Sequence, residues 1–224
     1  MRMHDGDMDT LMERLRAVQV SSLCDADKGL AVVDAAIRAM VPDVSFAGPA
    51  FTLLAYDDHL PVLVALREAE PGSVLVVATN SLRKAVSGEL FATEARRRGL
   101  AAIVIDGYCR DVRGLRRIGL PVHARGTNPM SGTTRDPGTF GREVLLGRVR
   151  VSPGDLLVGD DDGIVVGPRE RFAAAIDTAE EIERAEKALV EGMAAGRDLH
   201  GMTTVDEHLA ALAKEQPSAL GFTV

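Results

Sequence analysis

The sequence predicts an α/β protein, and three observations lead to this fold class. The middle of the chain alternates continuous apolar runs with amphipathic segments, as in parallel strands that are joined by helices. Short strand-like segments separated by turn residues follow, which indicates an antiparallel layer. The length of 224 residues, 46% of them apolar, suffices for one domain with a sizeable core. We therefore expect a single domain that spans residues 1–224.

The N-terminal quarter is expected to contain two helices and a strand. Helical spacing of apolar side chains predicts a first helix over residues 8–19. These apolar side chains are Leu11, Met12, Leu15 and Val18. The segment Ser22-Leu23-Cys24-Asp25 has the form of a capping box, so a second short helix is expected to start there. Residues 44–56 are strand-like, with Gly48-Pro49 as an interruption.

Strands and helices then alternate along the chain. Helices are expected at 59–69, 88–98 and 112–118, and strands at 74–78, 101–105 and 122–125. Pro71-Gly72 ends the first of these helices, and Gly99 closes the second as a C-terminal cap. The run Val74–Ala78 is apolar throughout, which is typical of a strand that is buried on both faces.

The C-terminal half is expected to change character after a long loop. Residues 126–140 are rich in Gly, Pro, Thr and Ser and predict that loop. Antiparallel strands are then expected at 149–151, 156–158 and 164–166, with turns at 153–155 and 161–163. A long amphipathic helix over 169–195 and a short one over 205–214 complete the expected elements. The apolar stripe of the long helix consists of Phe172, Ile176, Ala179, Ile182, Leu189 and Met193.

Composition and charge disfavour several classes of function. The formal net charge of −7 argues against a nucleic-acid binder, because neutralising phosphates requires a basic surface. Cys24 and Cys109 fit no metal or redox spacing and are expected to be free thiols. No apolar run approaches the roughly 20 residues of a membrane span, and the acidic N-terminal stretch is unlike a signal peptide. We therefore expect a soluble, cytoplasmic protein that binds neither nucleic acid nor membranes.

Several well-known catalytic signatures are missing from the sequence. There is no His-Glu-x-x-His pair for a zinc hydrolase, no Gly-x-Ser-x-Gly elbow and no P-loop. No Gly-x-Gly-x-x-Gly follows a strand, which disfavours a nicotinamide or S-adenosylmethionine site. The four lysines lie outside apolar runs, so a Schiff-base mechanism is poorly supported.

One expected helix start has the features of an anion site. Ser87 is expected to cap this helix, leaving the amides of Glu89, Leu90 and Phe91 free to point outward. A helix start carries positive potential and binds carboxylates well. Gly88 would let a ligand approach the backbone closely.

Arg110 and Asp111 are the second part of the candidate site. They follow a buried strand at the edge where α/β sheets usually bind ligands. The Arg can clamp an anion, and the Asp offers a hard oxygen ligand to a metal. The same pair is also common in an ordinary surface turn, and Gly88-Glu89 in an ordinary helix cap. Two further candidates are not assigned to the site: Asp160-Asp161-Asp162-Gly163 is interpreted as a hairpin turn, and His123 as structural or incidental.

The order of these motifs resembles the RraA-like family, which includes the 4-hydroxy-4-methyl-2-oxoglutarate aldolases, also called oxaloacetate decarboxylases. Twenty residues separate Glu89 from Arg110, which is the acid-x20-Arg-Asp spacing of the family's catalytic members. Further segments resemble family signatures in order: Ser22–Ala26, Gly48–Ala50, Ala124–Pro129 and Pro153–Gly163. The likeness covers about residues 15–195, which would form the domain core and leave a helical tail at about 196–224.

The resemblance implies an α/β/β sandwich of the swivelling-domain type with flanking N- and C-terminal helices. It also implies a homotrimer, or a hexamer built from two trimers, with sites between subunits. By this likeness Asp111 would bind Mg²⁺ or Mn²⁺ directly, and Glu89 would hold a metal-bound water. Arg110 would contact a 2-oxo acid whose carboxylate is received by the backbone of Gly88, Glu89, Leu90 and Phe91. The implied reaction cleaves a 4-hydroxy-2-oxo acid to pyruvate, with oxaloacetate decarboxylation beside it.

Two departures and one alternative accompany the resemblance. The family's aldolases carry Asp where this chain has Glu89, and many relatives have Asp-Gly-Gly where it has Ala78-Thr79-Asn80. The alternative is a non-catalytic regulator that binds a ribonuclease, since such regulators share the fold. Those regulators lack the Asp after the Arg, so Asp111 favours the enzyme.

Overall fold

The computed structural model describes residues 5–223. Residues 1–4, part of the stretch considered for a signal peptide, and residue 224 lie outside that range. The helices are α1 (Asp5–Ala17), α2 (Val20–Ala26), α3 (Leu60–Glu68), α4 (Glu89–Arg97), α5 (Val112–Ile118), α6 (Arg169–Ala194), the short 3₁₀ helix η1 (His200–Met202) and α7 (Val205–Leu212). The strands are β1 (Ala31–Val32), β2 (Arg38–Ala39), β3 (Phe46–Leu54), β4 (Val74–Ala78), β5 (Ala85–Ser87), β6 (Ala102–Cys109), β7 (Val122–Thr127), β8 (Thr139–Phe140), β9 (Val144–Leu146), β10 (Val149–Val151), β11 (Leu156–Gly159) and β12 (Ile164–Gly167).

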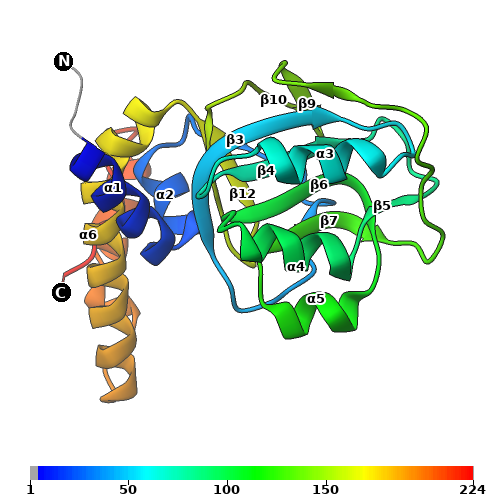
Figure 1. The fold of residues 1–224 in the computed structure, drawn as a ribbon. Helices are drawn as coiled ribbons and strands as arrows, with labels where there is room; N and C mark the ends of the chain where they lie inside the picture. Colours follow the sequence, from blue (N-terminus) through cyan, green and yellow to red (C-terminus); the bar gives the residue numbers. More distant parts are fainter. Residues whose placement is uncertain (1–4, 224) are drawn as a thin grey trace.

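A parallel sheet forms the centre of the molecule (Figure 1). β3, β4, β6 and β7 lie side by side and all run in the same direction. The register pairs Leu54 with Ala78 and Ala78 with Asp106, so these strands carry their C-terminal ends to one edge. β4 and α5 have the predicted bounds, because both are defined by local apolar patterns and by Gly or Pro at their ends.

Layers of side chains cover the parallel sheet on both faces. α3, α4 and α5 pack on one face, where Leu66, Ala92 and Leu115 meet strand side chains (Figure 1). On the other face, side chains such as Val104 and Leu157 join the sheet to β9, β10, β11 and β12. α1, α2 and α6 cover the outer side of β11 and β12. The predicted α/β class, with an α/β/β arrangement and flanking helices, is confirmed.

The strand β3 runs without a break through Gly48-Pro49, so the predicted interruption is wrong. The first half of β3 pairs antiparallel with β11, as Leu156 does with Pro49, and the second half pairs parallel with β4 from Ala50 onward. Pro49 lacks an amide donor, and it lies where the strand changes partners. A Cβ at Gly48 would lie 2.2 Å from the carbonyl oxygen of Gly72, so the glycine allows a close approach of two backbones.

The capping box predicted at Ser22 is also wrong. α2 begins at Val20, so Ser22 lies inside the helix and is buried. The amide of Val20 donates instead to Asp160 Oδ2 at 2.9 Å, from the turn between β11 and β12. A carboxylate that is distant in sequence therefore satisfies the helix start, and local motifs do not contain that information.

Two strands extend further than predicted and shorten the loop between residues 126 and 140. β6 continues past Ile105 to Cys109, because β5 and β7 both pair with its last residues. The turn-like Asp106-Gly107 is accommodated as an irregularity in the ladder with β7. β7 reaches Thr127, and Thr139–Phe140 forms β8 beside β3.

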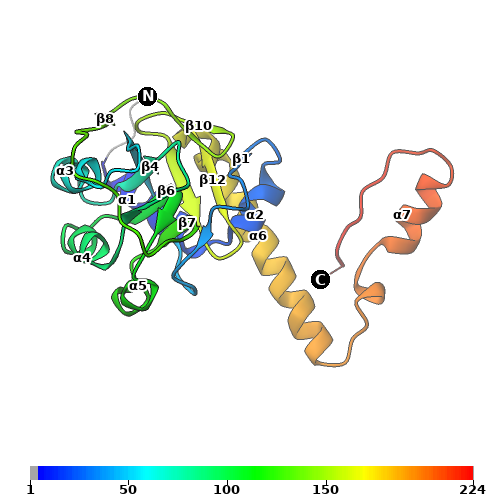
Figure 2. The same cartoon turned by 90° about the vertical axis from the view of Figure 1, so that its right-hand side faces the viewer.

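The C-terminal part of the chain forms an arm that leads away from the layered body (Figure 2). Phe172 and Ile176 of the predicted stripe are buried, but Met193 is 41% exposed because the last turns of α6 extend beyond the body. None of the residues of α7 is buried. Within residues 5–223, no helix is long and apolar enough to cross a membrane.

Candidate active site

The sheet brings the two predicted halves of the site together. β5 and β6 run parallel and pair Ser87 with Cys109, so the residues that follow each strand are neighbours. The amide of Arg110 donates to the carbonyl oxygen of Ser87 at 3.0 Å. Gly88 and Arg110 thus leave the sheet side by side at its C-terminal edge, where parallel sheets commonly bind ligands.

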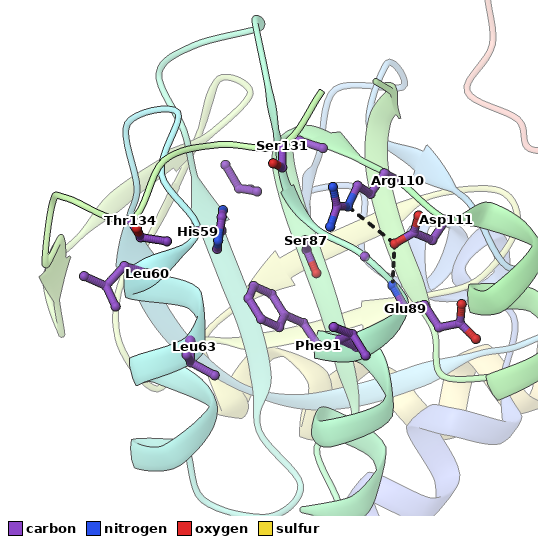
Figure 3. Close-up of a pocket in the computed structure, with 14 residues that line it drawn as sticks. His59, Leu60, Leu63, Ser87, Glu89, Phe91, Arg110, Asp111, Ser131 and Thr134 are labelled. Carbon is purple, nitrogen blue, oxygen red and sulfur yellow. Dashed lines mark hydrogen bonds and ion pairs between the residues drawn. The ribbon is translucent and has the colours of Figure 1, made fainter. Parts of the chain in front are cut away.

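Asp111 links these two segments through its carboxylate. Its backbone is left-handed, with φ 62° and ψ 38°, a conformation that Asp tolerates better than most residues do. Asp111 Oδ2 accepts a hydrogen bond from the amide of Glu89 at 3.3 Å and lies 3.4 Å from Arg110 Nε (Figure 3). The predicted cap by Ser87 is wrong: Ser87 belongs to β5, Gly88 is the N-cap, and Asp111 supplies the acceptor.

Gly88 leaves the space that the Asp111 carboxylate occupies. A Cβ at this position would lie 2.5 Å from Asp111 Oδ2 and 2.9 Å from Arg110 Cγ. Both distances are shorter than real Cβ contacts allow, so any larger residue would displace one of the two side chains. The glycine is therefore required for this pairing of Arg and Asp, in addition to any close approach by a ligand.

The Glu89 side chain points away from the pocket, toward α5 (Figure 3). Its carboxylate forms an ion pair with Arg117 Nη2 at 2.9 Å. A Cβ at Gly114 would lie 2.3 Å from Glu89 Cδ, so the side chain rests directly on the backbone of α5. The structure thus brings the Glu89 amide to Asp111 and the Glu89 carboxylate to a surface arginine.

A pocket of about 340 Å³ opens beside these residues (Figure 3). It is lined by His59, Leu60, Leu63, Ala85, Val86, Ser87, Gly88, Glu89, Leu90, Phe91, Arg110, Asp111, Ser131 and Thr134. All the predicted site residues are therefore on its wall. Its volume falls in the lower range of small-molecule sites.

The wall contributed by α3 was not predicted from the sequence. His59, Leu60 and Leu63 line the pocket, and the His59 ring lies 6.0 Å from that of Phe91. The order of the elements could have indicated this wall, because α3 follows β3 and therefore starts at the same sheet edge as Arg110. That prediction depends on β3 and β4 being parallel neighbours, which the sequence alone does not show.

The loop that carries Ser131 and Thr134 is held in place by hydrogen bonds on two sides. On one side, the backbone of Ala85 donates to Met130 and accepts from Gly132, both at 2.8 Å. On the other, the amide of Thr133 donates to the carbonyl oxygen of Asp57 at 2.9 Å. The pocket wall formed by this loop is thus tied to β5 and to the start of α3.

The buried carboxylate of Asp58 is the main anchor of this loop. Its Oδ2 accepts hydrogen bonds from Thr133 Oγ1 at 2.6 Å and from the amides of Arg135 and Asp136 at 2.7 and 3.0 Å. Its Oδ1 accepts from the amide of Leu60 at 2.8 Å. Burial alone would raise the pKa of Asp58, but these hydrogen bonds outweigh it and lower the pKa to about 2.

Asp58→Asn is expected to lower the free energy of unfolding by about 2–4 kcal/mol at neutral pH, because hydrogen bonds to a charged group contribute roughly 1.5–3 kcal/mol each. The folded pKa lies below the unfolded value of about 3.9, so the stabilisation is present above that value and lost as the pH falls toward 2. Urea denaturation at pH 7 and pH 3 measures both effects. Asp162→Asn, in an exposed turn, is the matched control. A loss at pH 7 no larger than that of the control would contradict this role.

The cysteines, His123 and the turn after β11 are structural. Burial raises the pKa of the Cys109 thiol to about 11, so it stays protonated and is no nucleophile. Both Cys109 and Cys24 are free, as predicted. His123 is fully buried, with Nε2 2.9 Å from the carbonyl oxygen of Asp160, and Asp160–Gly163 forms the predicted turn between β11 and β12.

The donor groups at this site suit one kind of metal ion. No group of three or more His, Cys, Asp or Glu side chains in the described part of the chain lies close enough to hold a metal by itself. Asp111 offers a single carboxylate, 43% exposed at the pocket rim. Mg²⁺ commonly takes one or two protein carboxylates and completes its shell with water and substrate oxygens, and Mn²⁺ suits the same ligands. The residues therefore fit Mg²⁺ or Mn²⁺ that is shared with a substrate.

Comparison with known sequences identifies the family. A family model described as Aldolase/RraA, RraA-like, matches residues 20–166. A protein from Halalkalibacterium halodurans named "Putative 4-hydroxy-4-methyl-2-oxoglutarate aldolase" is 32% identical over 169 residues. The matched region covers 75% of this chain and 80% of that protein.

Solved structures agree with this assignment. A crystal structure of a protein from Pseudomonas syringae pv. tomato has a TM-score of 0.77 at 24% identity. The match covers 86% of this chain and 96% of that protein's chain, and at this identity it supports the fold alone. RraAS2 from Streptomyces coelicolor, described as an unusual member of the RNase ES inhibitor RraA protein family, has a TM-score of 0.69 at 29% identity. That match covers 84% of this chain and 97% of the other. The family model matches more than half of the chain, and the chain therefore belongs to the RraA-like family.

Proposed function

We propose that this protein is a divalent-metal-dependent carbon–carbon lyase that releases pyruvate from a 2-oxo acid. The main activity would be aldol cleavage of a 4-hydroxy-2-oxo acid, with oxaloacetate decarboxylation as a second activity of the same site. The observation that carries the proposal is the pairing of Arg110 and Asp111 beside the start of α4, on the wall of one pocket. The similarity to a relative named as an aldolase supports the same reaction class.

Substrate binding would use the start of α4 and the adjacent arginine. The N-cap of α4 is Gly88, and the first-turn amides of Leu90 and Phe91 carry the positive end of the helix dipole. The substrate carboxylate is the anion that these amides would receive. Arg110 would contact the 2-oxo group from the neighbouring strand end.

The residues divide the chemistry between them. Asp111 would hold Mg²⁺ or Mn²⁺, which when bound supplies a Lewis acid to the 2-oxo acid. Arg110 would stabilise the negative charge that develops on the 2-oxo oxygen as the C3–C4 bond breaks. Glu89 is the candidate for passing a proton to and from water at the helix start. To take this role the Glu89 carboxylate would have to leave its exposed ion pair with Arg117, which holds it on the side of α5 away from the pocket.

The assembly is part of the proposal. Leu90 at the pocket rim is exposed, and Leu209 and Phe222 on the C-terminal arm are also exposed apolar side chains. Leu209 and Phe222 lie on an arm that leads away from the body (Figure 2), where a neighbouring subunit could cover them. We propose a cytoplasmic homotrimer or homohexamer with its sites between subunits.

Asp111 favours the enzyme over a ribonuclease-binding regulator, because such regulators lack an Asp after the Arg.

Removal of the metal tests the proposed reaction. Purified protein with Mg²⁺ or Mn²⁺ is expected to release pyruvate from 4-hydroxy-4-methyl-2-oxoglutarate and from oxaloacetate faster than the metal alone does, and EDTA is expected to lower the release to the rate measured without protein. The rate is measured by a coupled pyruvate assay, with Mg²⁺ added back in excess after EDTA as the control. Release in EDTA that stays above the protein-free rate, or release with metal that does not exceed that rate for either compound, would show the proposal to be wrong.

A further inference from the structure

One surface of the molecule is basic, although the chain as a whole is acidic with a formal net charge of −7. α4, its C-cap Arg98 and α5 together carry six arginines and two glutamates. The two helices are in contact, and Figures 1 and 2 show them side by side on one face of the sheet. We call this surface the basic face; its arginines are Arg96, Arg97, Arg98, Arg113, Arg116 and Arg117.

The outer side of α5 is the most concentrated part of the basic face. Arg113, Arg116 and Arg117 are all exposed and lie three and four residues apart, so they share one side of the helix, while Leu115 is buried. Arg117 pairs with Glu89. Arg113 and Arg116 form no ion pair with the described part of the chain. Like charges at this spacing repel each other, so carboxylates from outside the chain would stabilise this surface.

An acidic surface lies around Gln19. Gln19 lines two hollows of about 280 and 570 Å³, which therefore adjoin each other. Seven carboxylates line the two hollows, against two cations, Arg184 and Lys187. We call this surface the acidic hollows; its carboxylates are Asp43, Asp160, Asp161, Asp162, Glu180, Glu183 and Glu186.

Some of these carboxylates have partners within the chain and others are available. Glu180 pairs with Arg14, and the Asp160 carboxylate accepts from the amide of Val20. The side chain of Glu186 is exposed and forms no ion pair within residues 5–223. The acidic hollows therefore keep unpaired negative charge, as the basic face keeps unpaired positive charge.

The two surfaces are separate within one molecule. None of the arginines of the basic face lines either hollow. Figure 2 shows α6 on the other side of the sheet from α4 and α5. Contact between them is therefore a contact between two copies of the chain. Two basic faces set against each other would place like charges together, which is unfavourable.

We propose that the basic face of one copy binds the acidic hollows of a second copy. This inference rests on the proposed homo-oligomer and names the surfaces that join its subunits. The contact is head-to-tail, the type that generates closed rings when the rotation fits. Arginine suits it because the planar guanidinium fork matches a carboxylate with two hydrogen bonds. Single exposed ion pairs contribute little, so the contact depends on several pairs that lose water together.

The wild-type protein tests the inference without any substitution. Sedimentation velocity over a dilution series gives the dissociation constant between subunits. Raising NaCl from about 0.05 M to about 0.5 M is expected to raise this Kd at least about 10-fold, because salt screens the charges of both surfaces. A Kd that salt does not change overturns the inference and leaves the oligomer standing. A chain that stays monomeric overturns both, and the pyruvate assay still tests the lyase reaction separately.

Charge reversal on α5 tests the basic face. Arg113→Glu/Arg116→Glu is expected to raise the Kd at least about 10-fold. Both side chains are exposed and lie outside the catalytic pocket, so the variant should keep its fold. Arg142→Glu/Arg148→Glu makes the same change of net charge at exposed positions beside β9 and is the matched control. An unchanged Kd in the α5 variant, or an equal rise in the control, overturns the assignment.

A mixture of two variants identifies the acidic hollows as the partner surface. Asp43→Asn/Glu186→Arg weakens the hollows, and Asn tolerates the left-handed backbone at position 43, where φ is 60°. Alone, this variant should also associate at least about 10-fold more weakly. Mixed with Arg113→Glu/Arg116→Glu, it is expected to form heterodimers with a Kd near that of the wild type, because its basic face meets intact hollows. If the mixture associates no better than either variant alone, α5 binds another surface and the proposal is wrong.

Discussion

Asp111→Asn is expected to lower kcat/KM for metal-dependent pyruvate release by at least about 100-fold, since it removes the proposed carboxylate ligand of the metal. Asn has almost the same shape as Asp and also tolerates left-handed backbone at this φ of 62°. Its side-chain oxygen can still accept the hydrogen bond from the Glu89 amide. The substitution therefore changes the charge of the site and keeps its geometry.

Two measurements separate a lost metal site from a lost fold. Calorimetric titration with Mn²⁺ is expected to detect binding in the wild-type protein and none in Asp111→Asn at the same concentrations. The thermal midpoint should change little, because Asp111 is exposed at the rim. Asp162→Asn is the control for removing a surface carboxylate. If Asp111→Asn kept full metal-stimulated activity, the proposed role of Asp111 would be wrong.

The sequence predicted those elements whose limits are set by nearby residues. β4 is an apolar run after Pro71-Gly72, and α5 lies between Asp111 and the left-handed Gly119, so both have local boundaries. Arg110 and Asp111 were found as an Arg-Asp pair shortly after a buried strand, although that strand was expected to end at residue 105 and continues to Cys109. Short-range patterns were thus sufficient for most of the layers and for one side of the pocket.

The features that the sequence did not predict depend on contacts between distant residues. Ser22 and Ser87 were expected to cap helices, but Asp160 and Asp111 supply the acceptors from 140 and 22 residues away. Leu63 reaches the pocket only because β3 lies beside β4. A serine near a helix start is a local signal, and a better-placed carboxylate from elsewhere in the fold can replace it.

Glu89 illustrates how one methylene group can change the role of a side chain. The family's aldolases carry Asp at this position, and the Asp side chain is shorter by one methylene group. Glu89 reaches across Gly114 of α5 and meets Arg117, a contact that the added length makes possible. Its amide stays beside Asp111 whichever acid is present, because that contact uses the backbone. The helix-start part of the site is therefore independent of this departure, whereas the proposed proton-transfer role would require the Glu89 carboxylate to leave Arg117.

Arg110→Ala is expected to lower kcat by about 100- to 1000-fold, the usual loss when a donor that stabilises transition-state charge is removed. Arg110→Lys should recover only part of this, because an ammonium group keeps the charge and lacks the planar fork that matches a 2-oxo acid. Arg110 is half-exposed, so both variants should fold. Steady-state kinetics with each variant, and with guanidinium added to Arg110→Ala, measure the loss and its chemical rescue.

The matched control is Arg150→Ala, which removes an exposed arginine that pairs with Glu143 away from the pocket. This control is expected to keep its full kcat, since a surface ion pair contributes little to folding and nothing to the site. Guanidinium should restore activity to Arg110→Ala alone, because only that variant leaves a space where the ion can sit beside Asp111. A kcat for Arg110→Ala near that of Arg150→Ala would mean that charge at the 2-oxo oxygen is stabilised by another group.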